Sequence, residues 1–370
     1  MIFLYDSKKY LKLGSTKDFF IPFVQLFVVL AFALIYHSAK LNEFDNYSRL
    51  IFLLPIYLML SSVKFNENTF IKVIIILSIL SLLSSGIYYL AEEKITFDQR
   101  INRDYPNRLN PVSSSAITYG NLCMTLFILN ICALLSDCEI HKRFIFLGLV
   151  SSLLSWSFSM TVGSLIGLAL FMIFLLYRGL LKISHKNVVG TIGLLFILSL
   201  TPLSSKFQLY AVNISNLVQN DTVYTSNIDN SIKERVFFID TAFDIIKENK
   251  LIGIGFNKFE KIVKDKSVER NIRIEARDHP HNDFLDIGVK AGFIGIIGLL
   301  IFYLLLYRFF NKHLDNEVSY FSISGLSVLI SQFGYMMTQT QFAHHQAVVF
   351  FLVLIIFFAS QIRKIGISKI

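Results

Sequence analysis

The sequence has 370 residues, of which 54% are hydrophobic and 16% are charged, and its formal net charge is +9. These values exclude an ordinary soluble domain, in which about a quarter of the residues are charged. They do not indicate nucleic-acid binding either. Most of the positive excess lies in short segments between apolar runs, where it sets the orientation of a membrane protein.

Long apolar runs predict the fold class. The chain is predicted to be an all-α polytopic membrane protein with about 10–12 transmembrane helices and one large, partly helical loop, because about 20 apolar residues cross a bilayer. The predicted spans lie near residues 19–38, 49–63, 70–90, 116–135, 144–160, 161–177, 188–203, 284–310, 318–337 and 346–361.

Lysine and arginine in the short loops predict the orientation. They fall on one side of the membrane, at Lys8 to Lys17, Lys64, Lys72, Lys142, Arg143, Arg178, Lys182, Lys186, Arg308, Lys312, Arg363 and Lys364. That side is predicted to be cytoplasmic, with both termini inside and with 91–115, 204–283 and 338–346 outside. The segment 91–115 is a partial exception, because it carries Arg103 and Arg108.

The long outside segment divides the predicted membrane domain into three parts. Residues 1–203 form the N-terminal transmembrane helices, residues 204–283 form the large loop, and residues 284–370 form the C-terminal transmembrane helices. A connection of this length is predicted to have structure of its own.

An amphipathic helix is predicted inside the large loop. Ser231 and Glu234 have the spacing of a capping box at its start. One apolar face follows at steps of three and four residues, at Ile232, Val236, Ile239, Phe243 and Ile246. Gly253 and Gly255 then form a turn, which is only a weak signal for a phosphate loop because no strand precedes it. A second short helix is predicted over residues 257–268.

Two histidines flank a proline where the loop meets the next span, in DHPHNDFLDIGVKAGFIG. Asn282 or Asp283 is predicted to cap the following helix, which places His281 beside the positive end of a helix dipole and favours a neutral imidazole. Such a group suits a general base working near pH 7. The alternative is a capping cluster that only fixes how the chain re-enters the bilayer. His279 ranks lower as the base, because the extended backbone before Pro280 points its side chain elsewhere.

Arginines near the histidines suit a phosphate or pyrophosphate group, since guanidinium binds phosphate oxygens bidentately. Arg273 and Arg277 precede the histidines, and Arg235 lies in the first turn of the predicted loop helix. A histidine base near such charges predicts glycosyl or phosphoryl transfer. The sequence shows no cytosolic nucleotide site, so a lipid-linked donor is predicted. The predicted substrate-binding residues are Arg277, Arg273, Asn282 and His279.

Four glycines after the histidine segment and two histidines near residue 345 are interpreted first as structural residues rather than as site residues. Gly288, Gly292, Gly295 and Gly298 stand at three- and four-residue steps and are interpreted as helix-packing positions. His344 and His345, in the last outside segment, are interpreted as interfacial residues first and site residues second. They are distant in sequence from His281, and the three cysteines lack ligand spacing, so neither a metal site nor a cofactor is predicted.

Two segments resemble the O-antigen ligase and polymerase superfamily of membrane glycosyltransferases, namely NSIKERVFFIDTAFDIIKENKLIGIGFNKF and ARDHPHNDFLDIGVKAGFIGI. RLNPVSSSAITYGNLCMTLFIL is also similar to an earlier family segment, more as it occurs in ligases. The resemblance covers most of the chain from about residue 100 onward, and the His–Asn pair is its most specific part. It implies that Arg235 is the loop-helix arginine and His281 the catalytic histidine.

The resemblance implies metal-independent transfer of a glycan from undecaprenyl pyrophosphate, in the bacterial inner membrane with the active site facing the periplasm. A ligase transfers the glycan to a lipid A-core sugar hydroxyl in lipopolysaccharide biosynthesis, whereas a polymerase joins lipid-linked repeat units. The segment from Asn110 to Gly120 favours a ligase. The remaining alternative is a non-catalytic transport or assembly protein, which is disfavoured because neither charged residues within the predicted spans nor internal repeats are seen.

One position departs from the family pattern. Family members often have arginine in a triplet that starts a middle span, whereas this sequence reads Ser159-Met-Thr-Val-Gly163, with Val162 at the arginine position. Three explanations remain open. Arg103, Arg108 or Arg277 supplies the missing charge, or the substrate differs, or the chain is a degenerate member.

Overall fold

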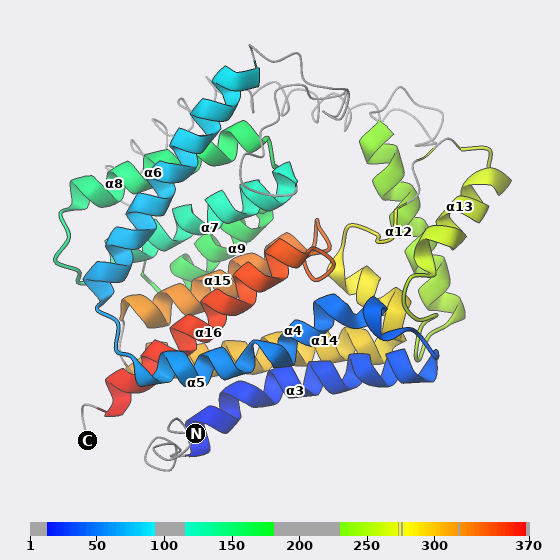
Figure 1. The fold of residues 1–370 in the computed structure, drawn as a ribbon, viewed down its shortest axis with the longest axis horizontal. Helices are drawn as coiled ribbons and strands as arrows, with labels where there is room; N and C mark the ends of the chain where they lie inside the picture. Colours follow the sequence, from blue (N-terminus) through cyan, green and yellow to red (C-terminus); the bar gives the residue numbers. More distant parts are fainter. Residues whose placement is uncertain are drawn as a thin grey trace. The chain divides into compact units, whose positions relative to one another are not determined.

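The computed structural model describes residues 13–92, 115–180, 230–272, 274, 277–316 and 319–367. The regular elements in these ranges are all helices, which confirms the all-α fold class (Figure 1). The predicted span at 188–203 lies outside the described residues, as do Arg103, Arg108 and Arg273. The division of the chain at residues 203 and 283 stays a prediction.

The observed helices follow the predicted spans closely. They are α3 (Leu13–Tyr36), α6 (Glu67–Glu92), α7 (Ala116–Leu135), α8 (Lys142–Ser159), α9 (Ser164–Tyr177), α14 (Asp283–Asn316), α15 (Tyr320–Met336) and α16 (His345–Ile367). The predicted span 49–63 is instead two helices, α4 (Asp45–Phe52) and α5 (Leu54–Ser62). Pro55 stands in the first turn of α5. Proline is tolerated there because the N–H groups of the first turn have no partner inside the helix.

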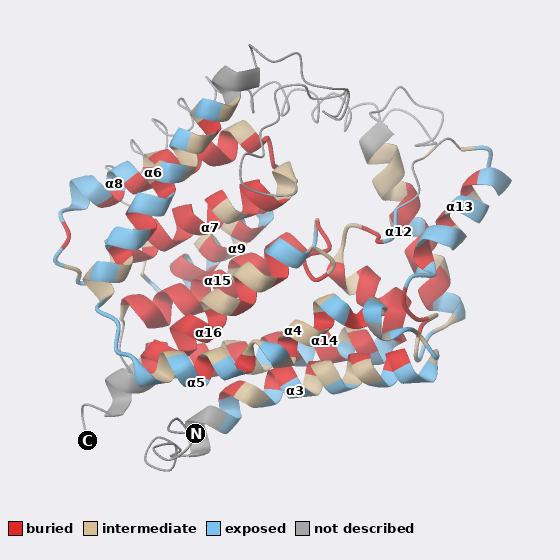
Figure 2. Cartoon of the chain, viewed as in Figure 1, coloured by how far each residue is buried: buried red, intermediate tan, exposed pale blue. Residues whose placement is uncertain are grey.

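Five described helices are long and apolar enough to cross a bilayer, and they contain Lys17–Tyr36, Glu67–Tyr88, Ala116–Leu135, Asp283–Leu314 and His345–Ile362. Large apolar side chains on α3 are exposed, including Val28, Phe32 and Ile35. Figure 2 shows exposed residues along α3. A lipid-facing helix has this pattern, because hydrocarbon chains solvate apolar side chains while the backbone bonds internally. The protein is a multi-pass membrane protein.

The chain forms two compact units. The first contains Met1–Phe65, Phe237–Leu329 and Gln339–Ile370, and the second contains Asn66–Val236 and Ile330–Thr338. In the first unit α3 packs along α14, and α16 packs on α4 and α5 (Figure 1). Aromatic rings join these helices, since Phe19 of α3 stacks on Tyr57 with centroids 4.8 Å apart and contacts Phe309 of α14 at 5.3 Å.

The second unit packs through small and polar residues. Helices α6, α7 and α8 contact one another, and α9 contacts α7. Asn130 of α7 donates a hydrogen bond to Ser78 Oγ of α6 at 3.0 Å. Gly148 of α8 lies against the Asn130 side chain, where a Cβ would collide with it. Small residues and interhelical hydrogen bonds are the usual means of holding helices together in lipid.

The predicted loop helices are α12 (Asn230–Glu248) and α13 (Phe259–Glu269). The described part of α12 that belongs to the first unit packs on α13 through Phe238 and Phe259, whose rings lie 6.3 Å apart. Lys266 of α13 donates to the Asp244 carboxylate at 2.7 Å. The side chain of Ser231 is not described, so the capping box stays a prediction.

Helix α14 is broken at Gly292, whose φ of 63° and ψ of −157° are not helical. At about 1.5 Å per residue its 34 residues would be about 51 Å long, well beyond a hydrocarbon core of about 30 Å. The break separates an entry segment from a long apolar segment. The interpretation of Gly292 as a packing residue alone is therefore wrong, because its backbone conformation is one that L-residues avoid.

Residues 250–255 supply the hydrogen bonds that the break leaves open. The N–H groups of Ile254 and Gly255 donate to the carbonyls of Val289 and Lys290 at 2.8 and 3.1 Å. The N–H of Phe293 donates to the Lys250 carbonyl at 2.8 Å. The turn at Gly253 and Gly255 therefore serves as a backbone partner for α14. Such a partner is necessary, because an unpaired peptide group near lipid costs several kcal/mol.

We expect Gly292→Ala to lower the stability of the folded protein, because the new Cβ would overlap the backbone of Leu251 and Ile252 and the conformation is strained for alanine. The strain alone is about 1–3 kcal/mol. The measurement is the midpoint of thermal unfolding in detergent. The control is Gly86→Ala in α6, where nothing lies within 4 Å of an added Cβ. Equal midpoints for the two variants would show that the break is not a constraint.

Candidate functional site

Three histidines from two distant segments lie together in the first unit. The rings of His279 and His281 are 4.7 Å apart, and the rings of His279 and His344 are 5.2 Å apart, both edge to face. Phe238 of α12 covers the His281 ring, with centroids 6.0 Å apart. The interpretation of His344 as mainly interfacial therefore needs correction, because its ring is part of the histidine cluster.

The entry into α14 fixes the backbone at His281. Asn282 Oδ1 accepts a hydrogen bond from the Leu285 N–H at 3.1 Å, so Asn282 is the residue that caps the helix, one of the two predicted alternatives. His281 itself has a φ of +54°, in the left-handed region that few non-glycine residues occupy. Backbone strain of this kind persists only where the surroundings hold it, and it is frequent at functional sites.

Asp283 holds the two histidine-bearing segments together. Its buried carboxylate accepts hydrogen bonds from the backbone N–H groups of Gln341 and Phe342, at 2.9 and 3.0 Å. These partners lie 58 and 59 residues further along the chain. Asp283 is fully buried, so removal of its carboxylate would leave two buried N–H groups unpaired.

Gln339 connects two of the histidines. Its Oε1 accepts a hydrogen bond from His281 Nδ1 at 3.0 Å, and its Nε2 donates to His344 Nε2. Burial, followed by the neighbouring His279, lowers the pKa of His344 to about 4. His344 is therefore neutral at pH 7. The described hydrogen bond that orients the His281 ring comes from Gln339, which lies 58 residues further along the chain.

His279 also lies inside the cluster, which corrects the expectation that its side chain points elsewhere. It is 8% exposed, and its Nδ1 donates to Asp278 Oδ1 at 2.5 Å. This hydrogen bond lowers the pKa of Asp278 to about 2. In the described part of the chain His279 Nε2 is buried without a hydrogen-bond partner.

A buried ion pair anchors the first turns of α14. Lys290 donates to Asp286 Oδ2 at 2.6 Å, and the Tyr47 hydroxyl donates to the same oxygen at 2.9 Å. Burial, then the nearby carboxylates, raises the pKa of Tyr47 well above its ordinary value, so its hydroxyl stays protonated. Both charged residues lie in a candidate span, which corrects the expectation that the spans carry no charge.

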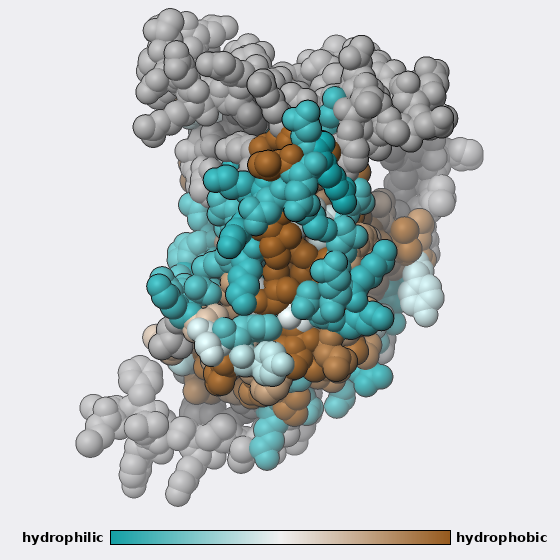
Figure 3. Space-filling view, turned by 90° about the vertical axis from the view of Figure 1, so that its right-hand side faces the viewer, coloured by the Kyte–Doolittle hydropathy of each residue, from teal (hydrophilic) through white to brown (hydrophobic). Residues whose placement is uncertain are grey.

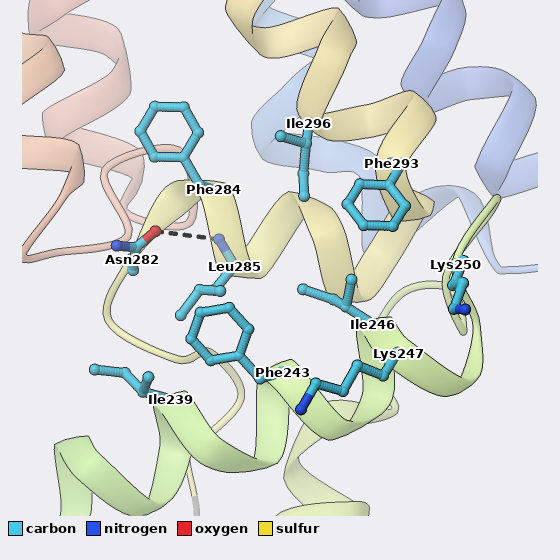
Figure 4. A pocket seen from close by; sticks show the side chains of 10 residues that line it. All are labelled: Ile239, Phe243, Ile246, Lys247, Lys250, Asn282, Phe284, Leu285, Phe293 and Ile296. Carbon is cyan, nitrogen blue, oxygen red and sulfur yellow. Dashed lines mark hydrogen bonds between the residues drawn. The ribbon is translucent and has the colours of Figure 1, made fainter.

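A groove lies between α12 and α14 (Figure 4). Its volume is about 580 Å³. The lining residues are mostly apolar: Ile239, Phe243, Ile246, Lys247, Lys250, Asn282, Phe284, Leu285, Phe293 and Ile296. Asn282, which directly follows His281, is one of them. Figure 3 shows apolar side chains exposed between hydrophilic ones on the face that carries α12 and α13.

Helix α12 has two apolar faces, whereas the sequence predicted one. The buried side chains of its first-unit part are Phe237, Phe238, Thr241, Ala242, Ile245 and Ile246. The predicted face instead supplies Ile239, Phe243 and Ile246 to the groove, and Phe243 remains 50% exposed. In Figure 4 Phe243 points toward Leu285 of α14. A large apolar side chain left open in a groove is typical of a binding surface.

The predicted arginines are placed as follows. Arg277 is exposed just before Asp278, and Arg273 lies outside the described residues. Arg235 lies on α12, three residues before Phe238, in the part assigned to the second unit, so its relation to His281 stays a prediction. Arg270 lies 3.7 Å from Asp244 and over the Phe237 ring at 5.6 Å, so it joins α13 to α12.

The Ser159–Gly163 segment forms a hydrogen-bonded turn in the second unit. Met160 is left-handed at a φ of 50°, and Trp156 Nε1 donates to the Thr161 carbonyl at 2.8 Å. Val162 is half-buried in this turn. Among the described residues, no group of three or more His, Cys, Asp or Glu side chains has an arrangement that could hold a metal ion.

The fold and site together define a multi-pass membrane protein with a histidine cluster beside an apolar groove. Residues 144–300 match the family model described as O-Antigen ligase. This match supports the predicted resemblance to the O-antigen ligase and polymerase superfamily over that part of the chain. The matched segment contains Arg235, His281 and Gly292, whereas Gln339 and His344 lie beyond it.

A similar protein is known from Haemophilus influenzae (strain Rd), where it is described as an uncharacterized protein. It is 23% identical to this chain over 369 residues, and the alignment covers 95% of this chain and 88% of that protein. The similarity therefore extends over both compact units.

Proposed function

We propose that this protein is an O-antigen ligase that transfers a glycan from undecaprenyl pyrophosphate to a sugar hydroxyl of lipid A-core. The observation that carries the proposal is the position of His281, one residue before the groove-lining Asn282. A substrate that is part glycan and part lipid needs a polar reaction centre beside an apolar channel. The proposed site faces the periplasm from the bacterial inner membrane.

His281 is the general base in this proposal. It removes the proton from the acceptor hydroxyl while the hydroxyl oxygen bonds to the anomeric carbon of the donor. The bond from that carbon to the pyrophosphate oxygen breaks, and undecaprenyl pyrophosphate leaves with the electron pair. Pyrophosphate is already a good leaving group, so base assistance is most useful at the weakly nucleophilic hydroxyl.

The groove is proposed to hold the isoprenoid chain of the donor next to its pyrophosphate. Its apolar lining and its volume of about 580 Å³ suit a few isoprene units, and Lys247 and Lys250 add positive charge to the same lining. Ammonium groups there favour the pyrophosphate. A neutral lipid chain without a phosphate would gain nothing from the two lysines.

The remaining predicted residues have binding roles in the proposal. Arg235, Arg273 and Arg277 neutralise pyrophosphate oxygens, and His279 and Asn282 contact the reacting sugars. Polymerisation of lipid-linked repeat units is the alternative reaction, since it differs only in the acceptor. A non-catalytic transport or assembly role is the second alternative. The buried charges of α14 do not favour it, because Asp286 and Lys290 neutralise each other before the Gly292 break.

We expect His281→Ala to lower glycan transfer by about 10²–10⁴-fold, the usual loss for a missing general base, without weakening donor binding. The measurement uses purified protein, the lipid-linked glycan and either lipid A-core or a second lipid-linked glycan, with a chelator present. His345→Ala is the control, because His345 is exposed and adjacent to the cluster. A fully active His281→Ala protein would remove the mechanism, and activity that disappears with the chelator would replace it with a metal-assisted one.

We expect Arg235→Ala to lower transfer by about a hundredfold or more while the protein still accumulates in the membrane. The reason is the loss of a charge-assisted contact to a pyrophosphate oxygen, which is worth a few kcal/mol. Arg235→Lys keeps the charge and is expected to retain part of the activity. Wild-type rates in both variants would show that Arg235 is only a solvated helix charge.

Phe243→Asp tests the groove. We expect it to raise the KM for the long-chain donor by about 10–100-fold, the value of burying one phenylalanine, and to leave kcat at saturation nearly unchanged. A donor with a short prenyl chain is expected to react equally with the variant and the wild-type protein. The control is Leu251→Asp, at an exposed apolar position outside the groove lining. If Phe243→Asp and the wild-type protein have equal KM values for the long-chain donor, the isoprenoid chain of the donor binds outside this groove.

A further inference from the structure

The side chain of Gln339 is held between two imidazoles and is 3% exposed. Its Oε1 faces His281 Nδ1 at 3.0 Å and its Nε2 faces His344 Nε2. A carboxamide has one accepting end and one donating end, so its two neighbours must present opposite hydrogen-bonding characters. The arrangement therefore specifies where the protons lie on both histidines.

The proton positions follow from the His344 end. The amide N–H groups of Gln339 can only donate, so the facing nitrogen of His344 carries a lone pair. His344 must therefore be neutral, which agrees with its lowered pKa of about 4. The accepting Oε1 then requires a proton on His281 Nδ1. In a neutral His281 the lone pair consequently belongs to Nε2.

We propose that Gln339 is a positioning residue that keeps His281 in the Nδ1–H tautomer with Nε2 as the proton-accepting nitrogen, and that His344 keeps the Gln339 carboxamide in the required orientation. The inference rests on the proposed role of His281 as the base. It adds two residues that lie beyond the segment matched by the family model.

The neutral partner also tunes the base. In many enzymes a carboxylate orients the catalytic imidazole and stabilises its charged form. Gln339 orients His281 without a negative charge. It therefore stabilises the protonated imidazolium less than a carboxylate would, which favours the neutral imidazole that acts as a base at neutral pH. The other titratable groups facing the cluster are His279 and His344, with Asp278 hydrogen-bonded to His279 and the carboxylates of Asp283 and Asp286 buried beyond them.

The hydrogen bonds of Asp283 to the backbone of Gln341 and Phe342, called here the Asp283 clamp, hold Gln339 at a fixed position relative to His281. Asp283 lies two residues after His281, and its backbone partner Gln341 lies two residues after Gln339. The carboxamide therefore reaches His281 because the chain next to both residues is joined by a buried hydrogen bond. The contact does not depend on the free rotation of a surface side chain.

The first test measures the tautomer directly. The wild-type protein, with ¹⁵N-labelled histidine in lipid nanodiscs, is examined by NMR, and the His281 signals are identified by their loss in His281→Ala. We expect a protonated Nδ1 and an unprotonated Nε2 in the wild-type protein, and a mixture or the opposite tautomer in Gln339→Leu. A protonated Nε2 in the wild-type protein, or no change in Gln339→Leu, would overturn the proposal.

The second test measures the reaction. We expect Gln339→Leu to lower kcat by about 10–100-fold, as is usual when the orienting partner of a functional histidine is lost, with little change in KM. Gln339→Glu is expected to recover part of kcat, because its carboxylate accepts the same proton. Its acid limb in the pH–rate profile is expected to move to higher pH by about one unit or more, because the carboxylate stabilises the imidazolium. Loss of a purely structural contact would not move that limb.

Two controls separate this proposal from the proposed function. Gln346→Leu changes an exposed glutamine at the start of α16 and is expected to leave kcat within about twofold of the wild-type value, as for surface substitutions. His344→Ala is expected to resemble Gln339→Leu. If His281→Ala is inactive while Gln339→Leu keeps the wild-type rate and pH profile, only the positioning role fails. If His281→Ala is active, the proposed function fails whatever the tautomer.

Discussion

The histidine site depends on the buried carboxylate of Asp283. Its two hydrogen bonds from the backbone of Gln341 and Phe342 join parts of the chain that are 58 and 59 residues apart. A buried backbone N–H that loses its hydrogen-bond partner costs about 1–3 kcal/mol, so loss of these two bonds would be expensive. Without this clamp the left-handed backbone at His281 would lose its support, and Gln339 would have no fixed distance to the imidazole.

The same short segment contacts both a polar cluster and an apolar groove. Asn282 caps α14 with its side chain and also lines the groove, while the preceding residue is the proposed base. In the proposed function, this adjacency places one helix start against both the lipid part and the sugar part of the substrate. The match to O-Antigen ligase over residues 144–300 agrees with such a division, because the matched segment contains both α12 and the start of α14.

The sequence predicted the helices, the histidine segment and the Asn282 cap because these features are local. Periodicity and capping preferences act within a few residues, so they can be read without tertiary information.

Gln339 and His344 were not recognised as partners of His281 because their contact spans 58 residues or more and leaves no periodic signal. The Gly292 break was missed for a different reason, since a glycine in an apolar helix looks the same whether it permits close packing or a left-handed backbone. The period predicted the apolar face of α12 that lines the groove, but a 3.6-residue period cannot tell a core from a binding surface.

The break in α14 has a consequence for how the protein is made. Residues 250–255, which pair with the open peptide groups at 289–294, precede them in the chain and leave the ribosome first. The matching strip of backbone is therefore already synthesised when the interrupted helix enters the insertion machinery. Because of this order, the backbone N–H and C=O groups at 289–294 can find their hydrogen-bond partners as soon as they meet hydrocarbon. Moving the LIGIGF turn to a later position would reverse that order, even if the final fold were the same.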